Sequence, residues 1–186
     1  MALLISNRPK ILISSVRASY IDHQYDFYKP KPGIYQIYPD SEYPVVDGKL
    51  SIQSYLKAVQ ECYLKLREKT KVSDVIEQTD FFCFHCPYYK MVQKAFTALI
   101  KTQYPNISPE SIGKMFEDKV QPSLFISQRV GNIYTGSLYA CLYSLLYKNP
   151  HIRDQKGLLF SYGSGLCSSM LQVKIIENPL SQQQIK

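Results

Sequence analysis

The ten residues from Phe81 to Lys90, FFCFHCPYYK, constrain the fold of this chain more than any other segment. Their apolar run predicts a buried strand, and His85 stands at the end of it. Pro87 suits the first turn of a helix, where its missing N–H is not needed, and Lys90 follows one turn later. Strand ends that lead into helices are where α/β proteins bind anionic ligands and place reactive groups. His85 is therefore the first candidate functional residue.

The rest of the chain continues this alternation of helices and apolar strands. Helical spacing of apolar residues covers 51–69, with Ser51 as the predicted N-cap, and recurs in 87–102, 112–116 and 137–148. Short apolar runs predict strands at 3–6, 11–15, 80–85, 158–160 and 171–176. Residues 22–48 are rich in tyrosine and proline and predict a long ordered loop, while 123–127 fit either a strand or a helix end. We expect an α/β fold.

The length and composition exclude several classes of protein. A chain of 186 residues with 45% hydrophobic residues is long enough to bury a core. No apolar run approaches the roughly 18 residues of a membrane helix. The segment Met1–Ser6 is too short for a signal peptide, because Arg8 and Lys10 interrupt it. We therefore expect a cytoplasmic protein that does not insert into a membrane.

The cysteines predict reduced thiols and no metal site. Without a secretory signal, the five cysteines are expected to stay reduced in the cytosol. Cys83 and Cys86 form a lone CxxC pair with His85 between them. A structural zinc site needs a second pair of ligands at a comparable spacing, and the sequence offers none.

The formal net charge of +7 predicts an anionic partner. Nucleic acid is one such partner, and the 16 tyrosines could serve as platforms on which bases stack. The tyrosines fall on helix faces or in loops, however, and no strand carries an RNP-type signature. A metabolite that bears phosphate groups explains the charge equally well, so the charge alone does not decide.

Three segments place small polar or basic residues beside a helix or a turn. The first contains His85, Lys90 and Lys94, the second is GNIYTGS at 131–137, and the third is SYGSG at 161–165. Glycine lets a ligand approach the backbone, and Asn and Ser side chains can donate hydrogen bonds to oxygen. Each segment also has a structural explanation: a satisfied histidine, a solvated lysine face, or a simple turn. SYGSG lacks the glycine of the GxSxG nucleophile elbow.

Five segments together resemble one known family. They are YDFYKP at 25–30, SEYPVVDGKLSIQSYL at 41–56, FHCPYYKMVQKA at 84–95, GNIYTGSLY at 131–139 and FSYGSG at 160–165. In the same order, they are similar to segments of the hydroxymethylglutaryl-CoA (HMG-CoA) synthases. The resemblance extends from about Leu3 to Gln172.

This resemblance implies a thiolase-like fold, in which two similar α/β halves each have a sheet between helices. It assigns residues 1–30 to the end of the N-terminal half, 31–177 to most of the C-terminal half, and 178–186 to a polar tail. The family condenses acetyl-CoA with acetoacetyl-CoA in the mevalonate pathway of isoprenoid and sterol synthesis. Coenzyme A enters as part of the substrates, so no separate cofactor is expected. Because members of the family form dimers, the resemblance also implies a homodimer. It implies no binding to nucleic acid.

The resemblance gives roles to individual residues. His85 matches the catalytic histidine that anchors and polarises the acetoacetyl thioester. Five further residues match positions that contact substrate or CoA: Ser51, Lys90, Lys94, Asn132 and Ser164. A histidine that donates to a thioester oxygen stabilises developing negative charge, as an oxyanion hole does.

The chain also departs from the family. The family's nucleophilic cysteine and catalytic glutamate lie upstream of the segment that aligns with Leu3, and none of the five cysteines replaces that nucleophile. At the position of Cys86 the family usually has a small polar residue. Residues 31–39 look additional, and 102–121 look shortened. We interpret the sequence as a synthase fragment that is inactive alone, with a mitochondrial form left open. The alternative is a non-catalytic CoA-binding or regulatory module that pairs with a full-length synthase.

Overall fold

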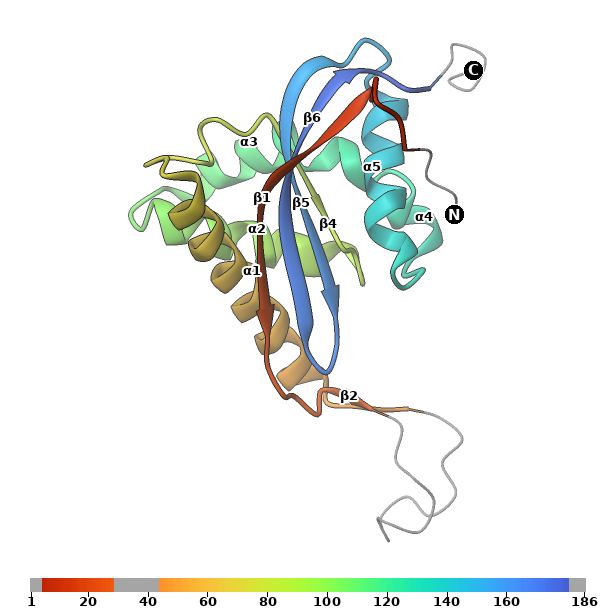
Figure 1. Ribbon diagram of the computed structural model, residues 1–186. Helices are drawn as coiled ribbons and strands as arrows, with labels where there is room; N and C mark the ends of the chain where they lie inside the picture. The colour runs from red at the N-terminus through yellow and green to blue at the C-terminus, as the bar shows by residue number, and fades with distance from the viewer. Residues whose placement is uncertain (1–4, 29–43, 181–186) are drawn as a thin grey trace, which may run out of the picture.

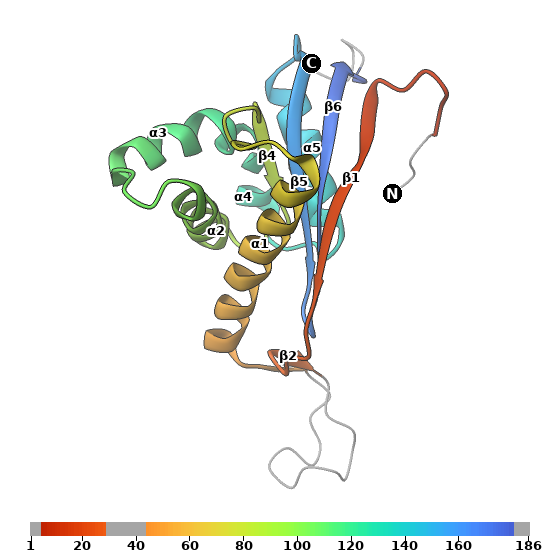
Figure 2. The same ribbon diagram turned by 60° about the vertical axis from the view of Figure 1, so that its left-hand side comes forward.

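Four strands form the central sheet of the protein, and helices cover both of its faces (Figures 1 and 2). The computed structural model describes residues 5–28 and 44–180. Its elements are β1 (Ile11–Ile21), β2 (Phe27–Tyr28), β3 (Val45–Val46), α1 (Gly48–Thr70), β4 (Phe81–Phe84), α2 (Tyr89–Gln103), α3 (Pro109–Lys119), the 3₁₀ helix η1 (Gln121–Leu124), α4 (Ser127–Val130), α5 (Gly136–Lys148), β5 (Arg153–Gly163) and β6 (Cys167–Glu177).

The sheet is mixed, with the strand order β1-β6-β5-β4. β5 and β6 form an antiparallel hairpin, and β1 adds to β6 in an antiparallel pair with a bulge between Ile13 and Arg17. β4 lies parallel to β5, so that Phe81–Phe84 pair with Gly157–Phe160. A parallel pair needs a long crossover, and α2, α3, η1, α4 and α5 supply it.

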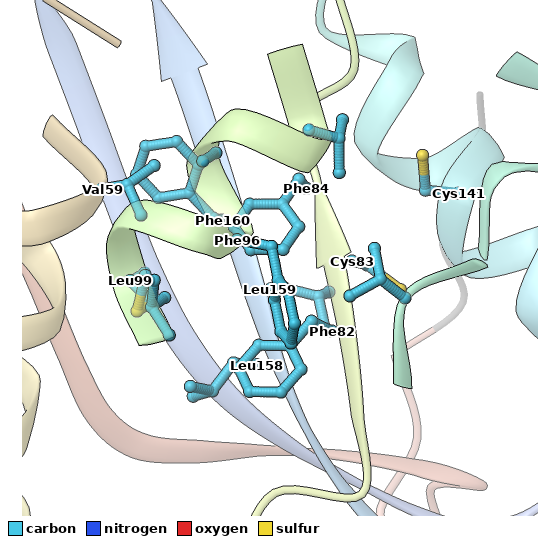
Figure 3. Packing of buried hydrophobic residues seen from close by; sticks show 14 of the residues in the cluster. Val59, Phe82, Cys83, Phe84, Phe96, Leu99, Cys141, Leu158, Leu159 and Phe160 are labelled. Carbon is cyan, nitrogen blue, oxygen red and sulfur yellow. The ribbon is translucent and has the colours of Figure 1, made fainter. Parts of the chain in front are cut away.

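β4 lies at the centre of the hydrophobic core. All four of its residues are buried, because helices cover it on both sides. The rings of Phe82 and Phe84 stack with centroids 6.2 Å apart, and Phe82 meets Phe96 of α2 edge-on. Cys83 points to the opposite face, on the side of α5 (Figure 3). The strand end that carries His85 is thus held from both faces.

The structure confirms most predicted elements and moves some of their ends. The predicted helices at 51–69, 87–102, 112–116 and 137–148 correspond to α1, α2, α3 and α5. α1 starts earlier than expected, because the Asp47 carboxylate caps it by accepting from the Leu50 N–H at 2.9 Å. Ser51 as the N-cap is therefore wrong. α2 begins at Tyr89, two residues after Pro87.

The predicted strands need further corrections. Residues 123–127 form η1 and the start of α4, so the strand alternative there is wrong. Ile5 and Ser6 are not in a strand, and the other two residues of that predicted strand lie outside the described residues. β5 and β6 are longer than expected, because the turn between them is confined to Ser164–Leu166. The loop predicted for 22–48 contains β2 and β3, while its middle, including 31–39, lies outside the described residues.

None of the helices in the described parts of the chain is both long and apolar enough to cross a bilayer. Within the same residues, no three side chains of His, Cys, Asp or Glu converge as metal ligands would. The buried cysteines Cys62, Cys83, Cys86 and Cys141 are free thiols, and Cys167 is an exposed one.

Gly157 leaves room for an aromatic ring of the neighbouring strand. A Cβ atom at this position would lie 2.1 Å from Cε2 of Phe81, whose ring is buried. We expect Gly157→Ala to lower the free energy of unfolding by about 1–3 kcal/mol in urea denaturation, because the ring cannot move without disturbing the core. Gly113→Ala is the matched control: it has open space on α3, and we expect it to stabilise the protein by up to about 1 kcal/mol. Equal effects of the two changes would contradict this account.

Candidate active site

His85 follows β4 directly, and three neighbouring residues hold it in place. Its N–H donates to the carbonyl oxygen of Phe160 at 2.7 Å, which continues the β4–β5 pairing. Its own carbonyl accepts from the Tyr55 hydroxyl of α1 at 2.5 Å. The ring of Tyr162 stacks against the imidazole with centroids 6.4 Å apart. Both hydrogen bonds use the main chain, so neither occupies an imidazole nitrogen.

The electrostatic setting of His85 favours an uncharged imidazole. The side chain is only 8% exposed, and burial lowers its pKa below the ordinary value of 6.5. At neutral pH the ring is therefore neutral, with one N–H donor and one nitrogen acceptor. Such a ring can donate a hydrogen bond to a carbonyl oxygen without carrying charge into the site.

The depressed pKa of His85 makes stability depend on pH. Below about pH 6.5 the unfolded chain binds a proton at this histidine before the folded chain does, so stability falls as the pH drops through that window. Above it the two states are equally uncharged and the effect vanishes. As the pH is lowered from 7.5 to 5, we expect the Tm measured by thermal unfolding to decrease less for His85→Gln than for the parent chain. His151→Gln, at an exposed histidine, is the control for losing an imidazole elsewhere in the chain.

Asp26 lies fully buried in the segment just before β2 and joins three parts of the site. Its carboxylate accepts from the Gly165 N–H at 3.0 Å and from the Tyr162 hydroxyl at 3.2 Å. Its main-chain oxygen accepts from the N–H of Asp47, the residue that caps α1. Asp26 thus connects the start of α1, the β5–β6 turn and the tyrosine that contacts His85.

Tyr162 lies between this carboxylate and the histidine: its hydroxyl donates to Asp26, and its ring stacks against His85. Burial is the main cause that raises its pKa above the ordinary value, and the negative charge of Asp26 adds to the effect. The phenol therefore stays protonated and donates to Asp26. Sequence reasoning missed both residues, although Asp26 lies in the YDFYKP segment and Tyr162 in the FSYGSG segment on which the resemblance rests.

Ser164 lies at the exposed tip of the β5–β6 turn, beside this network. The next residue, Gly165, donates its N–H to the Asp26 carboxylate that also accepts from Tyr162, so the turn joins the residues around His85 through Asp26. The turn is also fixed from outside, because the Gln24 N–H donates to the Gly165 carbonyl at 2.7 Å. These contacts bring two of the predicted site residues, His85 and Ser164, into one cluster.

Lys90 and Lys94 project from the first two turns of α2, close in sequence to His85. Both side chains are exposed, and their spacing of four residues puts them on one face of the helix. Among the described residues neither lysine takes part in an ion pair. Two ammonium groups without a carboxylate partner are suited to bind phosphate.

The other two predicted residues, Ser51 and Asn132, stay apart from this cluster in the described contacts. Ser51 is half-buried in the first turn of α1, four residues before Tyr55. Asn132 is exposed between α4 and α5, where its Oδ1 accepts from the Tyr134 N–H at 2.9 Å and from the Ser137 hydroxyl at 3.2 Å. Asn132 thus organises the loop before α5, and its amide N–H groups are the part that could donate to a ligand.

A mixed sheet between helices, with a buried histidine at the end of a strand, is the arrangement expected of part of a thiolase-like protein. Solved structures of that class superimpose on the chain. An HMG synthase of the curacin biosynthetic pathway, solved with an apo donor-ACP, covers 92% of this chain with a TM-score of 0.80 at 25% identity, over 40% of its own length. MvaS in complex with 3-hydroxy-3-methylglutaryl coenzyme A covers 90% with a TM-score of 0.75 at 27% identity, over 43% of its length.

The sequence comparisons name the family. The family model described as "Hydroxymethylglutaryl-coenzyme A synthase C terminal" matches residues 11–111 and 106–186. The chain therefore belongs to the HMG-CoA synthase family, and the resemblance found in the sequence is confirmed. HMG-CoA synthase 2 of Blattella germanica is 36% identical over 94% of the chain, and the cytoplasmic synthase of Gallus gallus is 32% identical over 96%. The mitochondrial synthase of Homo sapiens is also 32% identical, over 96%.

The chain spans less than half the length of these relatives: 46% of the Blattella, 41% of the Gallus and 42% of the Homo synthase. The thiolase-like α/β fold is confirmed for this part. The division at residue 30 stays a prediction, although β1 shares one sheet with β5 and β6. The roles assigned to the site residues stay predictions as well.

Proposed function

We propose that this chain supplies the acyl-CoA-binding part of an HMG-CoA synthase site, which in the complete enzyme condenses acetyl-CoA with acetoacetyl-CoA. The observation that carries the proposal is the β4–α2 junction. There His85, neutral and held by Phe160 and Tyr55, is followed within ten residues by Lys90 and Lys94, which form no ion pair with any residue that the structure describes. Family membership supports the same activity.

In this proposal each residue acts on a defined part of the substrate. The imidazole N–H of His85 donates to an oxygen of the acetoacetyl group and stabilises the negative charge that forms on it during carbon–carbon bond formation. Lys90 and Lys94 bind phosphates of the CoA moiety. Ser51, Asn132 and Ser164 line the acyl and CoA site. CoA is part of the substrates, so the site needs no separate cofactor.

The covalent step needs groups beyond this cluster. The resemblance assigns the nucleophilic cysteine and the proton-transferring glutamate to sequence outside these 186 residues. The cysteines in contact with the core do not suit the role, because Cys62, Cys83, Cys86 and Cys141 are all buried. We propose that the complete enzyme is a homodimer and works in the cytoplasm. Because the relatives include a cytoplasmic and a mitochondrial synthase, a mitochondrial form is the alternative.

Titration of the chain with acetoacetyl-CoA tests the proposal. We expect the double change Lys90→Ala and Lys94→Ala to raise the Kd about tenfold, because two exposed charge contacts with phosphate are lost. Isothermal titration calorimetry measures the change. Lys101→Ala, an exposed lysine in the last turn of α2, is the matched control and should leave the Kd unchanged. Equal affinities for all three proteins would rule out phosphate binding by Lys90 and Lys94.

The second candidate function is a non-catalytic CoA-binding module that pairs with a full-length synthase. Its support is that the predicted binding residues His85, Lys90 and Lys94 follow one another along the β4–α2 junction, which could bind CoA without the covalent step. Native mass spectrometry of the chain mixed with a full-length synthase separates the two functions. A stable mixed complex that changes turnover supports the module, whereas separate species with unchanged turnover count against it.

A further inference from the structure

The outer side of β1 carries main-chain groups that point away from the sheet. In the described sheet β1 pairs only with β6, and it forms the edge (Figure 2). In an antiparallel pair, alternate residues direct their N–H and C=O toward the partner strand, and the residues between direct theirs outward. The Lys10 carbonyl accepts from the Ile176 N–H at 2.8 Å, and Asp22 and Leu166 exchange two hydrogen bonds. Even-numbered residues of β1 therefore face β6, and odd-numbered residues face outward.

Lysines of α1 cover one part of this edge. The ammonium groups of Lys69 and Lys65 donate to the outward carbonyls of Arg17 and Ser19, at 2.9 and 3.4 Å. Lys69 lies in the last turn of α1, and β1 extends past this end of the helix in both views (Figures 1 and 2). Side chains that cap an edge strand keep other strands from pairing with it. This protection ends where α1 ends.

The open part of the edge is Ile11–Ile13. Outside the β1–β6 pairing, no described residue hydrogen-bonds to the main chain of Ile11 or Ile13. The bulge that follows adds two residues to β1, so it ends this stretch but keeps the same alternation on both of its sides. The side chains of Leu12 and Ile13 are 47% and 66% exposed, and successive side chains of a strand point to opposite faces. The stretch therefore offers hydrogen-bonding groups together with apolar surface.

The charges on both sides of this stretch are positive. Arg8 precedes it and Arg17 follows it, and neither exposed side chain forms an ion pair with a described residue. The carboxylate of Glu177 at the end of β6 is already paired with Lys10 at 3.1 Å. A second copy of the chain, paired antiparallel along the same stretch, would bring like charges together. A segment with acidic ends meets opposite charges instead.

We propose that the Ile11–Ile13 edge of β1 is a docking surface for an extended segment of another protein, with apolar residues at its centre and an acidic residue at each end. The segment adds to the sheet as a further strand. Its main chain bonds to the outward groups of Ile11 and Ile13, its apolar side chains cover Leu12 and Ile13, and its ends meet Arg8 and Arg17. The proposal does not depend on the acyl-CoA binding proposed above.

Fluorescence anisotropy of the fluorescein-labelled peptide EVTVTVE, titrated with the 186-residue chain at low salt, tests the docking surface. We expect saturable binding, and the peptide KVTVTVK should bind about tenfold more weakly, because its lysines meet arginines. Ile13→Pro removes an outward N–H and should raise the Kd for EVTVTVE about tenfold, while the pairing with β6 persists. Ile21→Pro is the matched control, at a residue that is 70% exposed and also faces outward, but at the far end of β1. It should leave the Kd unchanged.

Reversing the charges tests the partner's chemistry without a change to the strand. The double change Arg8→Glu and Arg17→Glu should make KVTVTVK bind more tightly than EVTVTVE. Equal affinities of the parent chain for the two peptides, or equal effects of the two proline changes in folded proteins, contradict the proposal. A failure of both peptides to bind up to about 1 mM overturns the docking surface. Dimerisation in sedimentation velocity that Ile13→Pro abolishes, without peptide binding, assigns the edge to a second copy and overturns the proposed partner.

Discussion

His85→Ala should lower kcat/KM for HMG-CoA formation about 10²–10³-fold, the loss typical when one donor to a developing oxyanion is removed. The assay uses a chimaera in which this chain replaces the matching part of the Blattella germanica synthase, to which it is 36% identical. Alanine leaves the carbonyl and N–H of residue 85 in place, so the bonds to Tyr55 and Phe160 persist. The loss should therefore come from the imidazole alone.

The control for this change is His151→Ala, an exposed histidine just before β5. It should keep full turnover in the same chimaera. His85→Gln should recover part of the lost rate, because its amide N–H can still donate to an oxygen. Full turnover of His85→Ala would contradict the role of His85, whereas equal losses for the two histidines would indicate a general loss of structure.

Asp26→Ala should lower the free energy of unfolding by about 2–5 kcal/mol, which makes it the largest stability effect that we expect at the site. The change leaves the Gly165 N–H and the buried Tyr162 hydroxyl without their acceptor. Because Tyr162 stacks on His85, the affinity for acetoacetyl-CoA should fall as well. Urea denaturation and calorimetric titration measure the two effects.

Two further variants show whether the buried carboxylate causes these losses. Asp26→Asn keeps an oxygen acceptor for Gly165 and should lose less stability than Asp26→Ala. Asp22→Ala removes a carboxylate from the same segment, bonded to Tyr20, Gln24 and Lys57 at the surface, and should destabilise far less. An Asp26→Ala protein as stable as the parent chain would disprove the connecting role of Asp26.

Local burial patterns explain why most elements could be predicted. In β4 the unbroken apolar run FFCF, and in α2 the helical spacing of the apolar residues, show in the sequence which side chains are buried. The ends of helices were harder to predict. Asp47 and Ser51 are both good N-cap residues, and only the backbone conformation shows that Asp47 is the cap. The sheet order could not be predicted, because β1 and β6 pair residues about 150 positions apart and no periodicity reports such a contact.

The sequence predicted the polar residues of the candidate site, but not Asp26 and Tyr162, which hold them in place. His85 and the two lysines were found because a histidine and adjacent basic residues stand out after an apolar strand. Asp26 was missed, since an aspartate in a tyrosine-rich loop looks solvated until β5, β6 and α1 close over it. That Asn132 donates to a ligand stays a prediction: its side-chain oxygen accepts hydrogen bonds within its own loop, and donation would use its amide N–H groups.

The position of β1 at the edge of the sheet has a consequence for folding kinetics. Its partner strand is β6, the last strand among the described residues, so β1 stays unpaired until residues 167–177 are available. Non-local pairing of this kind slows folding toward milliseconds to seconds, roughly the range of sheet-rich domains. During synthesis β1 leaves the ribosome well before β6 and stays unpaired until β6 follows. Over that interval its Leu12 and Ile13, exposed even in the folded chain, present apolar surface of the kind that favours aggregation.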